Sequence, residues 1–277
     1  MSGKLYLVST PIGNLGDMTI RGLEVLREVD FIAVEDTRIT LRLLNHFEIK
    51  KPLYSYYEHN SRESGERILA RLLGGESCAL VSDAGTPAIS DPGEELVRLC
   101  AEQNVEVVSV PGACALVSAL SVSALSSQRF CFEGFLSTAK KSRRERLELL
   151  HGEERTIVFY EAPHKLRATL SDLYETLGDR RIVICRELTK LHEEIIRTAL
   201  SDAAGMYAEH PPRGEFVLII EGAPEPPVAA MALEDAVEMA KPLLAQGVSS
   251  SAAAKKAALL SGRRKSEIYR QLMKDEK

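Results

Sequence analysis

The stretch CALVSDAGTPAISDPG, which spans residues 78–93, decides the fold of this chain. Its first four residues form a short apolar run typical of a buried β-strand, and two glycines and two prolines shape the loop that follows. Ligands of open α/β proteins bind at the carboxyl ends of strands, so this loop predicts a ligand site with Asp83 as a polar contact. Ser90-Asp91-Pro92 has the pattern of a helix start, which predicts that Asp91 caps a helix that ends near Gln103.

Short β-rich runs alternate with helical patterns on both sides of this stretch. The β-rich runs cover residues 4–9, 31–35, 77–82 and 105–109. An alternation of this kind predicts an α/β fold with a largely parallel sheet. We expect residues 1–125 to form this first domain.

A polar segment at residues 126–128 separates the first domain from a second group of elements. Apolar runs predict strands at residues 130–135, 156–160, 181–185, 194–199 and 215–220, and helical patterns cover residues 142–150 and 164–177. Several of these strands follow one another without a helix long enough for a parallel crossover. Residues 126–223 are therefore expected to form a second α/β domain with a mixed sheet.

A proline-rich segment at residues 223–227 predicts an extended connector, and only helical patterns follow it. Three predicted helices cover residues 234–245, 251–260 and 265–273. They indicate a small helix-turn-helix-like domain at residues 229–277. Helical spacing predicts that its inward-facing residues are Ala253, Ala257, Leu260, Ile268 and Leu272.

The net charge of −5 conceals two basic segments. Residues 248–274 hold seven cations and one anion, and residues 140–146 hold five cations and one anion. Clustered cations bind phosphates, so both segments predict RNA binding. The expected RNA contacts are Lys140, Lys141, Arg143, Arg144, Lys255, Lys256, Arg263, Arg264 and Lys265. A solvated tail that aids solubility, or a dimerisation element, is the alternative interpretation.

Composition argues against several other classes of protein. Five cysteines at irregular spacing, without a C-x-x-C pair, indicate reduced thiols in a cytoplasmic protein. The histidines do not form an H-E-x-x-H motif, so we predict no metal. No apolar stretch approaches the roughly 20 residues that span a bilayer, and no secretory leader is recognisable.

Two further loops follow predicted strands. Residues 9–17 do not match the G-x-G-x-x-G pattern of dinucleotide-binding domains, although Glu35 stands at the distance of a ribose-binding acid. Residues 108–115 lead into a small-residue helix whose free N–H groups can meet a ligand. Close packing of the following helix on the sheet could by itself explain any one of these strand-end loops. Three such loops in one domain together favour a ligand site.

Five segments carry a resemblance to a known family. They are STPIGN at 9–14, EDTR at 35–38, SDAGTP at 82–87, FYEAPH at 159–164 and RELTK at 186–190. Over residues 4–222 the chain resembles the ribosomal-RNA-modifying members of the tetrapyrrole methylase family, and its tail resembles their helix-turn-helix appendage. The resemblance implies an α/β, two-domain class III methyltransferase fold with a small C-terminal helical domain.

The same resemblance implies a reaction and its participants. S-adenosylmethionine would be the cofactor, and the ribose 2′-hydroxyl of a cytidine in the decoding region would be methylated. The implied partner is small-subunit ribosomal RNA or the assembled small subunit, and the implied oligomer is a homodimer. By position, the cofactor contacts would be Pro11, Ile12, Gly13, Asp83, Ala84, Gly85, Thr86, Gly112, Ala113, Cys114, Ala115, Tyr160, Glu161 and Glu215.

A ribose hydroxyl is a weak nucleophile that a nearby base can activate. Asp36, Arg38 and His59 occupy polar strand-end or loop positions and are the predicted catalytic residues. An ordinary ion pair explains Asp36 and Arg38 equally well, and a solvated loop explains the surroundings of His59.

Two other functions compete with RNA methylation. An enzyme of the same fold could methylate carbon on a tetrapyrrole, but it would not need a basic tail. A helix-turn-helix regulator could use its α/β body to sense a ligand, but the three strand-end loops suit catalysis better.

Overall fold

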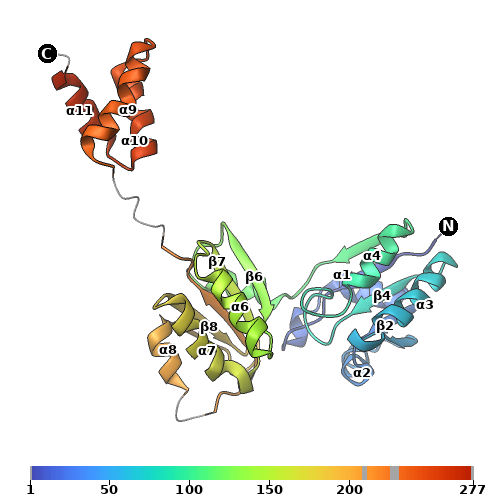
Figure 1. Cartoon of the computed structure of the whole chain (residues 1–277). Coiled ribbons are helices and arrows are strands. Elements are labelled where there is room, and N and C mark those ends of the chain that lie inside the picture. The colour runs from blue at the N-terminus through green and yellow to red at the C-terminus, as the bar shows by residue number, and fades with distance from the viewer. Residues whose placement is uncertain (1, 208–210, 225–230, 276–277) are drawn as a thin grey trace. The chain divides into compact units, whose positions relative to one another are not determined.

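The computed structural model describes residues 2–207, 211–224 and 231–275, except for the side chains of His59 and Asp275. The chain divides into two compact units, Met1–Ala223 and Pro224–Lys277. The first unit contains two five-stranded sheets (Figure 1). The predicted boundary between its two α/β domains at residue 125 stays a prediction, and the predicted proline-rich connector falls largely at residues 225–230, outside the described residues.

The first sheet has the strand order β3-β2-β4-β1-β5, and all its pairings are parallel, as predicted. Its strands are β1 (Leu5–Val8), β2 (Phe31–Val34), β3 (Leu53–Ser55), β4 (Cys78–Val81) and β5 (Val107–Val110). The helical elements around it are η1 (Leu15–Asp17), α1 (Ile20–Glu28), α2 (Thr37–His46), η2 (Glu58–Asn60), α3 (Ser61–Leu73), α4 (Glu94–Glu102) and α5 (Ala115–Val122). Strand β3 was not predicted.

Helices cover both faces of this sheet, which is why its central strands β2 and β4 are buried throughout. Residues of α3 and α4, such as Ile68 and Leu96, pack against one face. Residues of α1 and α2, such as Leu26 and Leu44, pack against the other face. Burial on both faces explains the uninterrupted apolar runs that made these strands recognisable.

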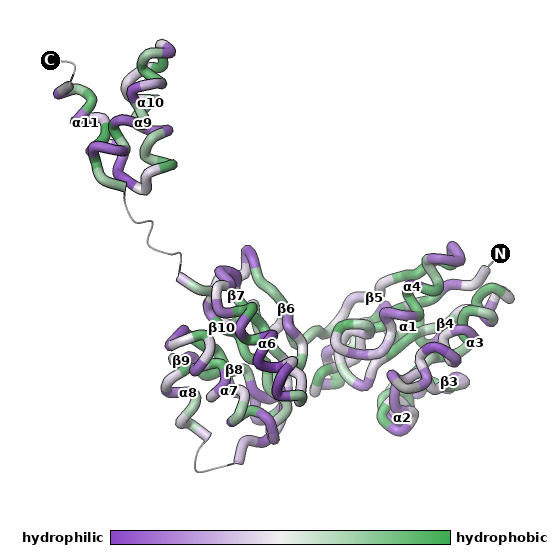
Figure 2. Tube along the Cα trace, viewed as in Figure 1, coloured by the Kyte–Doolittle hydropathy of each residue, from purple (hydrophilic) through white to green (hydrophobic). Residues whose placement is uncertain are grey.

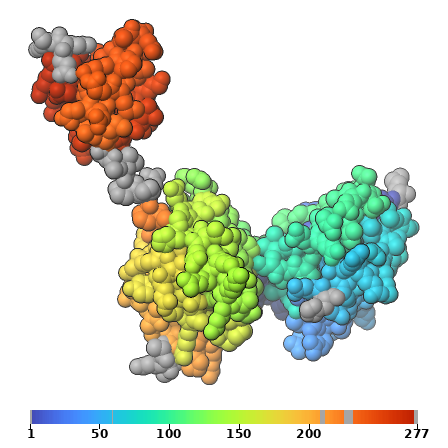
Figure 3. Space-filling view, in the orientation of Figure 1, coloured from blue at the N-terminus to red at the C-terminus, as the bar shows by residue number. Residues whose placement is uncertain are grey.

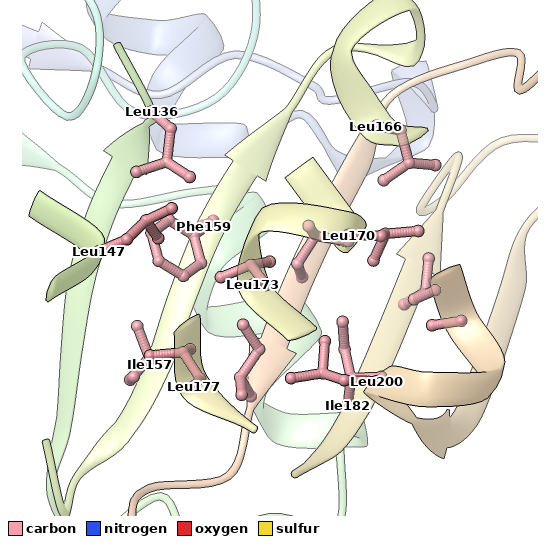
Figure 4. Packing of buried hydrophobic residues seen from close by; sticks show 14 of the residues in the cluster. Leu136, Leu147, Ile157, Phe159, Leu166, Leu170, Leu173, Leu177, Ile182 and Leu200 are labelled. Carbon is pink, nitrogen blue, oxygen red and sulfur yellow. The ribbon is translucent and has the colours of Figure 1, made fainter. Parts of the chain in front are cut away.

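The second sheet is mixed, as predicted, with the order β6-β7-β10-β8-β9. Its strands are β6 (Phe130–Phe135), β7 (Thr156–Glu161), β8 (Arg181–Arg186), β9 (Glu194–Ala199) and β10 (Phe216–Ile220), and its helices are α6 (Lys140–Leu150), α7 (Pro163–Leu177) and α8 (Leu200–Met206). Leu166, Leu170 and Leu173 of α7 pack against Phe159 of β7 and its neighbours (Figure 4).

The other face of the second sheet packs against the N-terminal half of the unit. Ala119 and Leu120 of α5 and Ile12 of the first strand-end loop share a core with Val158 of β7 and Val183 of β8. This shared core brings the first strand-end loop to the carboxyl end of β7.

The described part of the second unit contains three helices, as predicted: α9 (Leu233–Ala245), α10 (Ser250–Ser261) and α11 (Lys265–Asp275). They form a compact body (Figure 3). Of the five residues predicted to face inward, four are buried. The prediction for Leu260 is wrong, because its side chain is 63% exposed and the neighbouring Ser261 is the buried residue of the last turn of α10.

The start of α4 also differs from the prediction. The helix begins at Glu94, its N-cap is Gly93, and no side chain caps it. Gly93 has a φ of 149°, and a Cβ there would lie 2.9 Å from the Cβ of Ala88. Because this turn needs glycine, the helix starts two residues later than the Ser-Asp-Pro pattern suggested, and Asp91 is not its cap.

None of the described helices is both long and apolar enough to cross a bilayer. In the same described ranges, no three His, Cys, Asp or Glu side chains are grouped in a way that could hold a metal ion.

Candidate functional site

A cavity of about 490 Å³, here called the main cavity, is bordered by the strand-end loops of the first sheet and the ends of β7 and β10. This volume lies in the range of small-molecule sites. Ten of the predicted cofactor contacts line it: Ile12, Asp83, Ala84, Gly85, Thr86, Cys114, Ala115, Tyr160, Glu161 and Glu215.

The other four predicted contacts lie close by. Pro11 and Gly13 line a smaller cavity of about 260 Å³, here called the side recess. Gly112 packs on β1, since a Cβ there would lie 2.9 Å from the Cβ of Ser9. The carbonyl of Ala113 accepts a hydrogen bond from the Thr86 hydroxyl at 3.1 Å. The roles of all four remain predictions.

Hydrogen bonds hold the three strand-end loops together. The backbones of Thr10 and Gly85 exchange two hydrogen bonds, of 2.8 and 3.0 Å. The hydroxyls of Ser9 and Thr86 are 3.1 Å apart. Gly85 lines the main cavity and has a φ of 83°, a backbone conformation that favours glycine. The loops that the sequence singled out separately therefore form one ligand-binding edge.

Three carboxyl groups, Glu35, Asp83 and Asp91, line one side of the main cavity and are here called the acidic wall. Burial, followed by the charge of Asp83, raises the pKa of Glu35. Its Oε2 atom is buried and has no hydrogen-bond partner in the part of the chain that the structure describes. No Lys or Arg is among the described residues that line the main cavity, so the acidic wall is suited to a positively charged ligand.

Asp83 and Asp91 differ in how they are held. The Oδ1 of Asp83 accepts a hydrogen bond of 3.1 Å from the backbone N–H of Asp36. Burial raises the pKa of Asp83 despite this bond. Burial, followed by the charges of Glu35 and Asp83, raises the pKa of Asp91 to about 7. Asp91 makes no hydrogen bond or ion pair with any described residue, so its carboxyl is available to a ligand.

Sequence reasoning missed Asp91 as a site residue because its neighbours imitate a helix cap. The available signal was the length of the loop, which brings residues 89–91 back to the main cavity. Ala88 and Ser90 have φ angles of 65° and 61°, and such conformations in residues other than glycine cluster at functional sites.

The second sheet contributes Tyr160 and Glu161 to the opposite side of the main cavity. The Tyr160 hydroxyl accepts a hydrogen bond of 3.0 Å from the backbone N–H of Leu116 at the start of α5. Glu161 is 2% exposed and accepts hydrogen bonds from the backbone of Ala162 and the hydroxyl of Thr169. Both residues are rigidly placed.

Glu215 is more exposed, and its Oε2 lies 2.9 Å from Nζ of Lys190. The stem of Lys190 crosses Gly13, where a Cβ would lie 2.4 Å from its Cγ. Gly13 therefore makes room for Lys190, and this contact fixes the first strand-end loop against the second sheet.

Asp36 and Arg38, two of the predicted catalytic residues, are not among the described residues that line the main cavity. Asp36 caps α2 by accepting the Arg38 backbone N–H at 2.8 Å, and it also binds the Arg38 guanidinium. These hydrogen bonds lower the pKa of Asp36 to about 2, which makes it a weak base. His59 lies in η2, and its side chain is outside the described part of the structure.

The predicted RNA contacts on α6 are only partly available, although this helix is strongly hydrophilic (Figure 2). The side chain of Arg143 is 12% exposed and lies 2.5 Å from Asp172. Arg144 pairs with Glu148 at 2.8 Å, whereas Lys140 is exposed.

In the tail, Lys255, Lys256 and Arg264 are exposed, as predicted. Lys265 is also exposed, and its Nζ donates to the Ser251 hydroxyl at 2.8 Å. Arg263 is half-buried, because its guanidinium donates to the Met231 carbonyl at 2.7 Å.

Residues 4–204 match the family described as Tetrapyrrole (Corrin/Porphyrin) Methylases. The chain is similar to proteins named ribosomal RNA small subunit methyltransferase I. One from a Synechocystis species is 50% identical over 257 residues, which are 92% of each chain. One from Bacillus subtilis is 46% identical, with 96% of this chain and 93% of the relative covered. One from Pseudomonas aeruginosa is 46% identical, with 98% and 97% covered.

Solved structures share the fold at low sequence identity. The uroporphyrin-III C-methyltransferase of Thermus thermophilus, crystallised with S-adenosylhomocysteine, is 18% identical with a TM-score of 0.56, and the alignment covers 79% of this chain and 97% of that one. A diphthine synthase is 15% identical with a TM-score of 0.59, with 79% and 90% covered. At these identities the likeness concerns the fold alone.

Proposed function

The chain belongs to the tetrapyrrole methylase family, and from this membership we propose that it uses S-adenosylmethionine to methylate small-subunit ribosomal RNA at the 2′-hydroxyl of a cytidine. The observation that carries the proposal is similarity over nearly the whole chain to proteins named ribosomal RNA small subunit methyltransferase I. The basic tail supports an RNA substrate over a tetrapyrrole.

The residues of the main cavity fit S-adenosylmethionine. This cofactor carries a positively charged sulfonium, and the acidic wall offers three carboxyl groups in a cavity that no described Lys or Arg lines. Backbone N–H groups at the start of α5, other than that of Leu116, can serve its polar parts. When bound, the cofactor supplies an electrophilic methyl group.

We assign the proton-accepting role to Asp91. The ribose hydroxyl must lose its proton when it is methylated, and the carboxyl of Asp91 would accept that proton. A carboxyl whose pKa lies near neutrality is a well-matched acceptor. A positive charge in the main cavity would favour the ionised form of Asp91, so the residue becomes a base when the site is loaded.

Asp36 and Arg38 take a different place in this proposal. Their mutual hydrogen bonds hold the start of α2, and the backbone of Asp36 holds Asp83. They act as positioning residues for the acidic wall. The proposal has three further parts, which agree with a ribosomal substrate. The chain forms a homodimer, lies in the cytoplasm and binds the assembled small subunit.

Labelled methyl transfer separates the candidate functions. The full chain is incubated with methyl-labelled S-adenosylmethionine and either small-subunit ribosomal RNA or a uroporphyrinogen-type tetrapyrrole. We expect label in the RNA alone. Label in the tetrapyrrole would indicate a carbon methylase, and cofactor binding without any transfer would indicate a ligand-sensing regulator.

A further inference from the structure

The side recess adjoins the main cavity. Pro11 and Gly13 line the side recess, Ile12 between them lines the main cavity, and Asp83 lines both. The main cavity and the side recess therefore lie on either side of this strand-end loop. A chain-like ligand can occupy both at once.

One exposed cation borders the side recess without a protein partner. Arg42, on α2, makes no ion pair or hydrogen bond with any residue that the structure describes. Arg38, one turn earlier, lies 2.5 Å from Asp36 and is thereby neutralised. Asp83 is the single acidic residue among those that line the recess, and burial raises its pKa. A guanidinium without a carboxylate partner is suited to a phosphate.

The remaining lining combines apolar and polar groups. Leu15 and Ile39 line the recess with side chains that are 42% and 40% exposed, so they offer apolar contact to a base or a ribose. Asn14 uses its carbonyl oxygen to accept the Gly16 backbone N–H at 2.9 Å. Its NH₂ group remains available as a donor.

We infer that the side recess binds the nucleotide next to the methylated one, with Arg42 on its phosphate and Leu15 and Ile39 against its base or ribose. The inference rests on the proposed RNA substrate. A strand whose reactive ribose lies in the main cavity has its neighbouring nucleotide within reach of the adjoining recess. The volume of about 260 Å³ is compatible with one nucleotide.

The test compares three full-length variants, Arg42→Ala, Arg42→Lys and Arg129→Ala. The last is a matched control, because Arg129 is also exposed and precedes β6, at the end of the second sheet opposite Tyr160. Binding to a transcript of small-subunit ribosomal RNA is measured without cofactor at several salt concentrations. Methyl transfer and S-adenosylmethionine affinity are measured separately.

We expect Arg42→Ala to weaken RNA binding about 5- to 20-fold and to lower the slope of log K against log salt by about 0.7, the value for one phosphate contact on a single strand. Arg42→Lys should keep the slope, because it keeps the charge. KM for RNA should rise in Arg42→Ala, with kcat at saturating RNA and the affinity for S-adenosylmethionine unchanged.

The inference is overturned if Arg42→Ala keeps the parent's RNA affinity and salt slope, if Arg129→Ala changes them equally, or if the parent does not bind the transcript. Failure of the proposed function would give a result different from these three. The parent would then bind the transcript in a salt-dependent manner that needs Arg42, yet transfer no methyl group to it.

Discussion

At the scale of single residues, Asp91 is the group on which the proposed chemistry depends. Asp91→Asn removes the proton acceptor but keeps the shape of the side chain, so we expect kcat to fall about 100-fold or more, the usual contribution of a general base. The affinity for S-adenosylmethionine, measured by calorimetry, should change by less than about 5-fold, because we assign Asp91 to the ribose proton and the amide keeps the size and polarity of the side chain. Glu102→Gln, on the exposed side of α4, is the control and should retain full activity. Equal activity of the two variants would remove Asp91 from the mechanism.

The same substitution should affect stability in the opposite direction. The pKa of Asp91 is about 7 in the folded chain and near 3.8 when unfolded, so the unfolded chain releases this proton first as the pH rises. Stability from this group is therefore lost between about pH 4 and pH 7. We expect the Tm of Asp91→Asn to equal the parent's near pH 4 and to exceed it at pH 8. A Tm difference that is independent of pH would contradict the assigned pKa.

Asp83 belongs to the cofactor side of the acidic wall. Asp83→Ala should weaken S-adenosylmethionine binding about 10-fold in a calorimetric titration, because it removes a carboxyl group that faces the cation. The loss of one hydrogen bond to the Asp36 backbone should lower stability by only about 1 kcal/mol. An unchanged dissociation constant would show that Asp83 does not contact the cofactor.

At the scale of elements, helix α6 carries two predicted RNA contacts of different character: Arg143 is mostly buried, and Lys140 is exposed. Arg143→Ala breaks a contact with Asp172 and a hydrogen bond to Thr169 in a side chain that is 12% exposed, and we expect a loss of about 2 kcal/mol in the free energy of unfolding. Lys140→Ala, on the same helix but exposed, should cost nothing measurable. Chemical denaturation of both variants makes the comparison. Equal stability would mean that Arg143 is free for RNA after all.

The strands and helices also show which elements can be predicted from sequence patterns. Strands such as β4 and β10 were predictable because burial on both faces requires an unbroken apolar run. Strand β3 was not, because it is a three-residue edge strand of half-buried and exposed residues. The start of α4 was misplaced because Ser-Asp-Pro satisfies the rules for a cap, whereas tertiary packing at Gly93 selected the actual start.

The candidate site also has parts that the sequence could predict and parts that it could not. Loops at strand ends were predictable, since chain order and strand direction bring them to one edge. The acidic wall was not, because Glu35 and Asp91 are far apart in sequence and only the folded loop brings them into one cavity. The ion pair between Asp36 and Arg38 was one of the interpretations of the sequence, whereas no pattern showed that Arg42 has no partner among the described residues.

At the scale of the whole molecule, the three-helix unit should serve the RNA and not the cofactor. The substitutions Lys255→Gln, Lys256→Gln and Arg264→Gln together remove three exposed cations without touching the buried face. We expect weaker RNA binding and a salt slope lower by about 2, with unchanged affinity for S-adenosylmethionine, because Met1–Ala223 is a compact unit by itself. Filter binding at several salt concentrations measures this slope. If the slope is unchanged but the mass in solution falls, the tail is a dimerisation element.

The most direct test of the central claim identifies the methylated atom. Small ribosomal subunits from cells that lack this protein are incubated with the full chain and methyl-labelled S-adenosylmethionine, and the RNA is digested to nucleosides and analysed by mass spectrometry, with Asp91→Asn as the matched control. The account predicts label in 2′-O-methylcytidine with the parent chain and almost none with the variant. Label on a base, on another nucleoside or nowhere in the RNA would contradict it.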